Sequence, residues 1–170
     1  VNTCGMMVAE EWVKGEPTGR YFVFGSYLSD KAKETRAHVK EIHKLSPGKR
    51  PIAYGGAHAE SGWREAWAHA GVPVFAPCFN GLWVQINTLW MAFEQNKLIV
   101  FSDLQNVIDE LRTMSREIDS EDDTPIPDRI KDESKYHRIA ALRYLGTRLF
   151  RNLYRKLARG EKPDTDNMPF

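Results

Sequence analysis

Two strand-like segments separated by a glycine-containing turn open the chain. Cys4–Val13 is apolar and then alternating, and Arg20–Leu28 is rich in aromatic and β-branched residues. Lys14–Arg20 between them holds Gly15, Pro17 and Gly19, which is typical of a turn. The pattern therefore predicts an antiparallel hairpin, and a hairpin commits the fold to a sheet with at least two antiparallel strands.

Helical and strand-like patterns alternate after the hairpin. The apolar spacing predicts helices over residues 30–45, 59–70, 81–95, 102–118 and 134–159, with a loop over 120–131. Short strands are expected at Pro51–Tyr54, Val72–Ala76 and Lys97–Phe101. The expected order is two strands, three helix–strand units and two helices. It predicts an α/β fold with a mixed sheet, central strands at Arg20–Leu28, Pro51–Tyr54 and Val72–Ala76, and helices on both faces.

Composition narrows the class of protein. The 170 residues suit one domain, and at 42% hydrophobic they can build a core, to which we assign Trp63, Trp67, Trp83 and Trp90. No apolar run reaches the roughly 18 residues of a membrane span, so we expect no membrane partner. The net charge of +1 does not indicate a nucleic-acid binder, but acids concentrate in residues 103–133 and bases in 135–162. The basic block is either one binding face or a solvated helix.

Familiar catalytic motifs are absent from the sequence. There is no phosphate-binding G-x-x-x-x-G-K-[ST] or G-x-G-x-x-G, and Cys4 and Cys78 fit no metal spacing. Ligands of a parallel sheet sit where strands end, which points to Gly55 and the residues after it. Glu60 is the one acid between Tyr54 and Ser61, and His137 lies near the start of the last helix. These residues alone do not make a nuclease, and Cys78 favours packing over catalysis.

Two segments resemble a known family. Residues 137–144 read H-R-I-A-A-L-R-Y, similar to the pattern H-x-x-D-A-x-R-Y of phage terminase large subunits in their C-terminal nuclease domain. Residues 57–61, A-H-A-E-S, resemble the D-x-A-E of the same family. The resemblance implies a ribonuclease-H-like nuclease domain over residues 1–160, a tail over 161–170, and a missing first strand that would precede Val1.

The sequence departs from the family where the acids belong. Ala57 and Ala140 stand at two catalytic and metal-binding positions, and Gly25-Ser26 replaces a further acid. The resemblance implies a Mg²⁺- or Mn²⁺-dependent endonuclease that cuts concatemeric double-stranded DNA during packaging. It also implies that His137 and Glu60 join the catalytic positions, with Glu60 a remnant metal ligand. Because alanine supplies no oxygen ligand, we expect this chain to bind metal poorly and to be inactive.

The resemblance also implies partners and a location. These are double-stranded DNA, a terminase ATPase domain, a small terminase subunit and a portal, in the cytoplasm of an infected bacterium. The DNA-contacting candidates are basic residues of the last helix: Arg143, Arg148, Arg151, Arg155 and Arg159. Arg143 either contacts phosphate or pins the helix to the sheet. Two alternatives remain open: a non-catalytic DNA- or partner-binding module, and another ribonuclease-H-like enzyme such as a resolvase or integrase.

Overall fold

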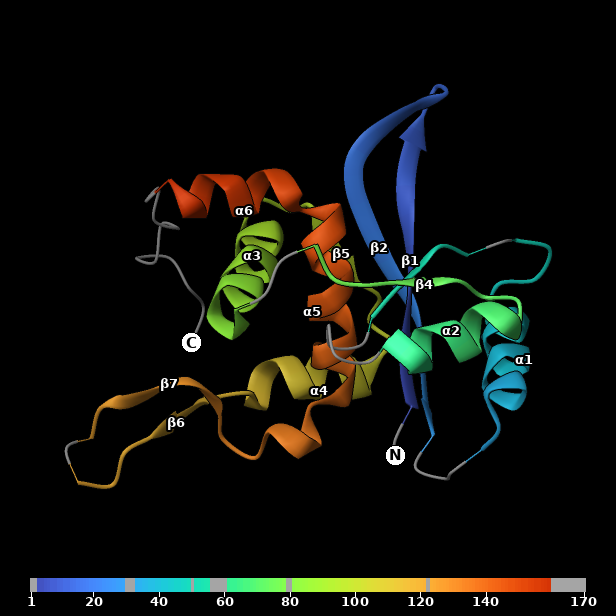
Figure 1. Cartoon of the computed structure of the whole chain (residues 1–170). Coiled ribbons are helices and arrows are strands. Elements are labelled where there is room, and N and C mark those ends of the chain that lie inside the picture. The colour runs from blue at the N-terminus through green and yellow to red at the C-terminus, as the bar shows by residue number, and fades with distance from the viewer. Residues whose placement is uncertain are drawn as a thin grey trace.

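A computed structural model describes residues 3–29, 33–49, 51–55, 61–78, 81–121 and 123–159 of the chain. A hairpin of two long strands runs through the molecule, and helices lie to either side of it (Figure 1). No helix among the described residues is long and apolar enough to cross a membrane.

The predicted hairpin is confirmed. Its strands are β1 (Thr3–Val13) and β2 (Glu16–Ser29), which pair antiparallel. The turn is shorter than expected, because Lys14 and Gly15 alone make it, with φ of 52° and 86°. Positive φ at both positions matches the twist of the flanking strands, so β2 already begins at Glu16.

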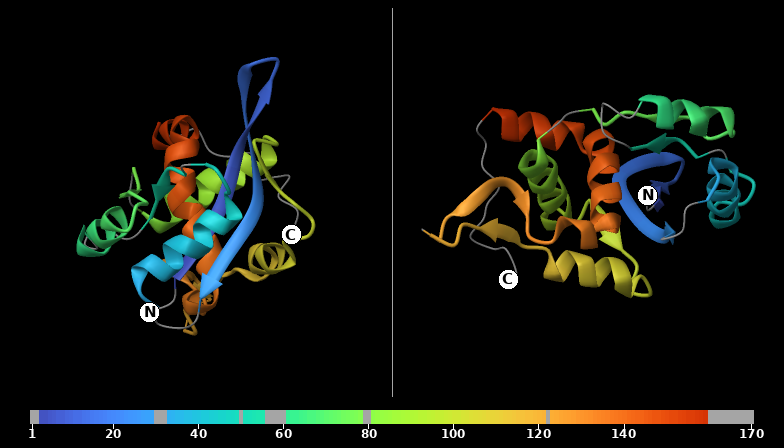
Figure 2. Two further views of the ribbon diagram at one scale, coloured as in Figure 1. Left: turned by 90° about the vertical axis from the view of Figure 1, so that its right-hand side faces the viewer. Right: turned by 60° about the horizontal axis from the view of Figure 1, so that its bottom comes forward.

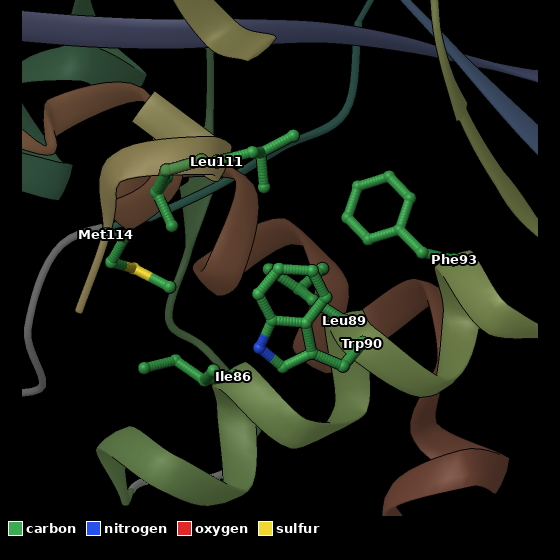
Figure 3. Close-up of a pocket in the computed structure, with 7 residues that line it drawn as sticks. Ile86, Leu89, Trp90, Phe93, Leu111 and Met114 are labelled. Atoms are coloured by element: carbon green, nitrogen blue, oxygen red, sulfur yellow. The ribbon is translucent and has the colours of Figure 1, made fainter. Parts of the chain in front are cut away.

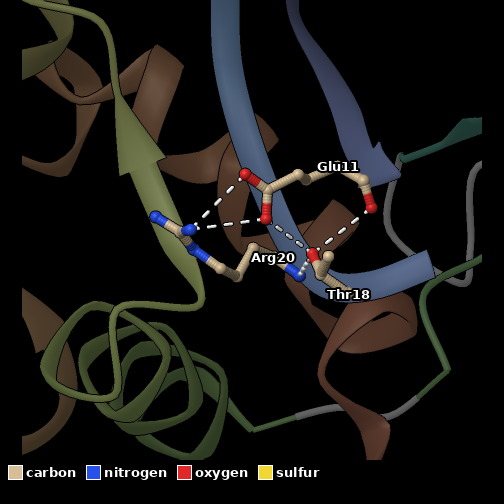
Figure 4. Close-up of polar contacts among 3 residues, drawn as sticks. All are labelled: Glu11, Thr18 and Arg20. Atoms are coloured by element: carbon tan, nitrogen blue, oxygen red, sulfur yellow. Dashed lines mark hydrogen bonds and ion pairs between the residues drawn. The ribbon is translucent and has the colours of Figure 1, made fainter. Parts of the chain in front are cut away.

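Polar contacts bind the two strands together near the tip of the hairpin (Figure 4). The Glu11 carboxylate accepts a hydrogen bond from Thr18 Oγ1 at 2.8 Å and forms an ion pair with Arg20 Nη1 at 3.3 Å. The Arg20 backbone N–H in turn donates to Thr18 Oγ1 at 3.2 Å. These contacts hold the hairpin in register where it leaves the body of the protein.

The main sheet is mixed, as predicted, but its membership differs from the prediction. β5 (Leu98–Val100) pairs parallel to β2, giving the order β1-β2-β5. β3 (Ala53–Tyr54) and β4 (Val74–Phe75) pair only with each other, in parallel. The prediction that both belong to the centre of the main sheet is therefore wrong for the hydrogen-bonded sheet. Each is two residues long, and Pro51 and Pro73, which lack an N–H, precede them closely.

Helices cover both faces of the main sheet (Figure 2). α1 (Thr35–Leu45) and α2 (Ser61–His69) lie on one side, and α5 (His137–Leu149) packs on β1 and β2 from the other. α3 (Leu82–Glu94), α4 (Gln105–Thr113) and α6 (Arg151–Ala158) pack around α5. The core accordingly has two parts. One lies between β2, β5, α3, α5 and α6, and the other between β1, α1 and α2.

Two predictions for the C-terminal half are wrong. The helix expected over 102–118 ends at Thr113, and β6 (Arg116–Ile118) and β7 (Pro125–Ile130) form a hairpin where a loop was predicted. A short 3₁₀ turn, Glu133–Lys135, leads into α5. The helix expected over 134–159 breaks at Phe150, which is 3% exposed and meets the Tyr21 ring edge-on. The break lets Leu142 and Leu153 both reach the core from differently directed helices.

The aromatic core is smaller than predicted. Trp67 is buried, but Trp63 is 37% exposed, and Trp83 and Trp90 are half-buried. Trp83 stacks under the Arg116 guanidinium at 4.1 Å, so it links α3 to the β6–β7 hairpin. Partial exposure of these rings follows from the thinness of a two-layer cover, where one face of each outer helix meets solvent.

Candidate functional site

The start of α5 is fixed by a carboxylate from α4. Glu110 is buried, and its Oε2 accepts hydrogen bonds from the backbone N–H groups of Arg138, at 2.9 Å, and Ile139, at 3.1 Å. Its Oε1 pairs with Arg138 Nη1 at 2.8 Å. A carboxylate at a helix N-terminus satisfies orphan donors and complements the helix dipole, so Glu110 sets where α5 begins.

Sequence reasoning missed Glu110 and counted it only within an acidic block. The signal that was available is its spacing, because Val107, Glu110 and Leu111 share one helical face and Val107 is fully buried. An acid on the buried face of a helix requires a buried partner. The partner lies 28 residues away in sequence, so its identity could not be predicted from local pattern.

Ala140 lies in the second turn of α5 and is half-buried. α5 packs against both β1 and β3, so Ala140 belongs to the helix that faces the end of β3. The described part of this segment ends at Gly55, whose N–H donates to Phe75 O at 2.9 Å. Ala57 and Glu60 lie outside the described residues, and the expected closeness of Ala57 to Ala140 stays a prediction. His137 is half-buried at the first position of α5.

Arg143 is an interior residue. Its side chain is 8% exposed, its Nη1 lies 3.7 Å from Glu133 Oε1, and its guanidinium lies 5.4 Å from the centre of the Tyr144 ring. Its Nε is buried and has no hydrogen-bond partner among the described residues. The geometry favours the pinning role over a direct phosphate contact, because a guanidinium this covered is not presented to a duplex.

A cysteine adjoins the buried ion pair. Burial raises the pKa of the Cys4 thiol to about 12, the Arg138 charge opposes that rise, and Glu110 adds to it. Cys4 is therefore a neutral thiol and a poor nucleophile at ordinary pH. Cys78 is exposed, and its backbone N–H donates to Thr147 Oγ1 at 2.9 Å, which ties the segment after β4 to α5.

A second polar cluster that sequence reasoning missed surrounds His38 of α1. Its Nδ1 lies 2.9 Å from Tyr27 Oη, its Nε2 lies 3.3 Å from Thr3 Oγ1, and its ring stacks on Trp67. Burial lowers the pKa of His38, and the Lys33 charge lowers it further. The ring thus joins α1, β1, β2 and α2 as a neutral packing residue on the face opposite α5.

An apolar pocket of about 10 Å³ opens between α3, α4 and α5 (Figure 3). Its lining is entirely hydrophobic or aromatic: Ile86, Leu89, Trp90, Phe93, Leu111, Met114 and Ile139. It has room for no more than a water-sized group and contains no acid or base, so it is not a catalytic site.

Three solved structures share this arrangement of strands and helices. The nuclease domain of the large terminase of bacteriophage SPP1, with bound Mn, matches at a TM-score of 0.55 and 18% identity over 84% of this chain and 83% of that one. The large terminase of a thermophilic bacteriophage matches at 0.65 and 14%, over 86% of this chain and 40% of that one. The P22 large terminase nuclease domain matches at 0.60 and 15%, over 89% and 79%.

This chain has the fold of large-terminase nuclease domains. The predicted α/β, ribonuclease-H-like class is thereby confirmed. No protein-family model matches the sequence, and no curated protein matches it.

The described part of this terminase-like fold does not fit a divalent metal ion. It contains no group of three His, Cys, Asp or Glu side chains placed to hold one. Ala140 presents only a methyl group, whereas Mg²⁺ and Mn²⁺ require oxygen ligands. Glu110, the acid that contacts the start of α5, is committed to Arg138 and two backbone N–H groups.

The predicted arginine stripe is divided in the terminase-like fold. Arg148 lies in α5, Arg151 and Arg155 lie in α6, and Arg159 follows α6. All are exposed, but the break at Phe150 turns α6 away from the axis of α5 (Figure 1). The single helical stripe with Arg148 at its head is therefore wrong as geometry. Arg151, Arg155 and Arg159 still share one side of α6, at a spacing of four residues.

Proposed function

We propose that this chain is a nuclease domain of a viral terminase large subunit whose metal-binding acids are replaced by alanine. The observation that carries the proposal is the fold, shared with three large-terminase nuclease domains over 84–89% of the chain. The resemblance at residues 137–144 adds to it, because that segment forms the start of α5. The ancestral activity is then metal-dependent cutting of concatemeric double-stranded DNA during packaging.

Arg143 supports an acidic ancestor at position 140. Its buried Nε lacks a hydrogen-bond partner in the described part of the chain, and its ion pair with the exposed Glu133 is long at 3.7 Å. Residues three apart on a helix are neighbours, so a carboxylate at position 140 would offer this guanidinium an acceptor. A buried cation with donors to spare is the state expected after loss of a nearby acid.

The test compares the chain with its double variant Ala57→Asp/Ala140→Asp. The unchanged chain should leave supercoiled plasmid intact in Mg²⁺ or Mn²⁺, whereas the double variant should bind Mn²⁺ in calorimetry and gain detectable nicking. Carboxylates at both positions supply the oxygen ligands that alanine lacks.

A matched control is Ala57→Asp/Ala141→Asp, which adds the same charge but turns one acid about 100° around α5. It should bind no metal. Robust nicking by the unchanged chain, or equal Mn²⁺ binding by the control, would contradict the assignment of position 140.

A second candidate is a non-catalytic module that grips DNA or a packaging partner through its arginines. The exposed side of α6, with Arg151, Arg155 and Arg159, favours it. Under either proposal the partners are double-stranded DNA, an ATPase domain, a small terminase subunit and a portal. The location that follows is the cytoplasm of an infected bacterium.

A further inference from the structure

β1 is buried like an interior strand but lies at an edge of its sheet. Met6 and Val8 pack against the core below α3 and α5, and Met7 packs into the core below α1 and α2. A strand that is apolar on both faces is typical of a sheet interior. Among the described residues, however, β1 pairs with β2 alone.

The β3–β4 pair continues the same layer beyond β1. α5 packs against both β1 and β3 on one face. On the other face, Ala53 of β3 and Val74 of β4 pack against the cluster that contains Met7 and Trp67. The two sheets are thus enclosed by the same helices, and no backbone ladder joins them in the described part of the chain.

The outer edge of β1 carries backbone groups that need partners. Within the described ranges, the one bond to β1 backbone from outside the β1–β2 ladder is the Thr18 hydroxyl on Glu11 O. Unpaired N–H and C=O groups beneath helices are costly. Natural edges are guarded by charges or proline, and residues 3–9, T-C-G-M-M-V-A, contain neither.

We propose that this edge of β1 is a docking site for one further β-strand, supplied by polypeptide that leads into Thr3. Such a segment reaches the edge through a two-residue turn and lies antiparallel on β1. It carries no proline and is apolar on both faces, since α5 covers one side and α1 and α2 the other. Once seated, it pairs with β1 and lies against the β3–β4 pair.

A grafted strand tests the proposal. About seven residues of alternating Val and Thr, followed by Asn-Gly, are fused ahead of Val1, which matches the usual length of a strand and its turn. Amide hydrogen exchange of residues 4–9 should slow by about tenfold, because edge amides become bonded. A Gly–Ser extension of equal length is the control and should leave their exchange unchanged.

Unchanged exchange of residues 4–9 in the grafted protein overturns the proposal, and so does equal protection by the Gly–Ser extension. Protection of β5, the other edge of the sheet, instead of β1 also overturns it. The same Val–Thr peptide added free in solution at equal concentration should protect far less. Equal protection by the free peptide overturns a source within the same polypeptide.

A disulfide supplies an independent measurement of register. In a Cys78→Ser background, cysteine is placed at each position of the graft in turn and oxidised with copper phenanthroline. Cross-linking to Cys4 should occur at one register, because a disulfide needs neighbouring Cα atoms about 5.5 Å apart. Absence of cross-linking at every position overturns the docking site. None of these readouts involves DNA or metal, so they stand or fall separately from the proposed function.

Discussion

Glu110 concentrates much of the local energetics in one side chain. It accepts two backbone N–H groups at the start of α5 and pairs with a guanidinium whose side chain is 16% exposed. Pairs this covered differ from surface pairs, because loss of one partner strands the other charge away from water. The position of α5, and with it of Ala140, therefore depends on a residue outside the candidate site.

Replacing Glu110 with alanine should destabilise the fold strongly. The expected loss is about 3–5 kcal/mol in the free energy of unfolding, since Arg138 is left buried and uncompensated. Urea denaturation followed by circular dichroism measures it. The matched control is Glu117→Ala, which breaks an exposed 3.8 Å pair with Arg129 and should cost less than about 1 kcal/mol. Equal losses in the two variants would show that the Glu110 contacts contribute nothing special.

The two cysteines should differ sharply in reactivity. Because its pKa is raised to about 12, Cys4 stays protonated at pH 8, and it is also half-buried, whereas Cys78 is exposed. A disulfide reagent such as DTNB should label one thiol quickly in the folded protein and both in denaturant. Cys78→Ser should remove the fast phase, and a fast phase that survives this substitution would place the reactive thiol at Cys4.

At the scale of elements, α5 meets α3 at unusually close range. A Cβ on Gly146 would lie 2.7 Å from Leu89 Cδ2 and 3.4 Å from Leu89 Cγ. Leu89 is 4% exposed and forms part of the main core, so it has little room to move. The glycine lets the two helices approach, at the cost of its own weak helix propensity.

Gly146→Ala should therefore lower stability although alanine is the better helix former. Overpacking typically costs about 1–3 kcal/mol, against about 1 kcal/mol gained in propensity. Gly62→Ala in α2 is the matched control, because nothing lies within 4 Å of its added Cβ among the described residues. Thermal unfolding should show a lower melting temperature for Gly146→Ala and an equal or higher one for Gly62→Ala. The reverse order would mean that Leu89 adjusts freely.

At the scale of the whole molecule, charge is distributed unevenly over a chain whose net charge is only +1. α6 presents Arg151, Arg155 and Arg159 at one end of the protein, far from α1 at the other (Figure 1). DNA binding by such a surface relies on phosphate contacts and counterion release, which carry no sequence information.

If α6 grips DNA, Arg151→Ala/Arg155→Ala should weaken binding to every duplex alike. Two lost phosphate contacts should also flatten the log–log salt dependence by about 2. Fluorescence anisotropy with one labelled duplex at several salt concentrations measures both effects. Lys40→Ala/Lys44→Ala in α1 removes the same charge from the far side and should change the slope little. Equal effects of the two pairs would favour a diffuse field over a DNA-facing helix.

The sequence by itself determined the elements whose signals are local. The turn at Gly15 dictates the hairpin, and apolar periodicity places α1, α2 and α3 close to their true positions. The resemblance at residues 137–144 indicated the fold because the motif begins a helix. Such features depend on residues within a few positions of one another, so they can be predicted without knowing the tertiary structure.

Only the tertiary structure decided the features whose partners lie far apart in sequence. Phe150 breaks the last helix because burying it against Tyr21 outweighs one more helical turn. Residues 116–130 form a hairpin although their prolines suggested a loop. Glu110 caps α5 across 28 residues, and Arg143 lies inside although an arginine pattern suggested a surface. Burial and long-range pairing depend on which surfaces meet, and periodicity carries no information about that.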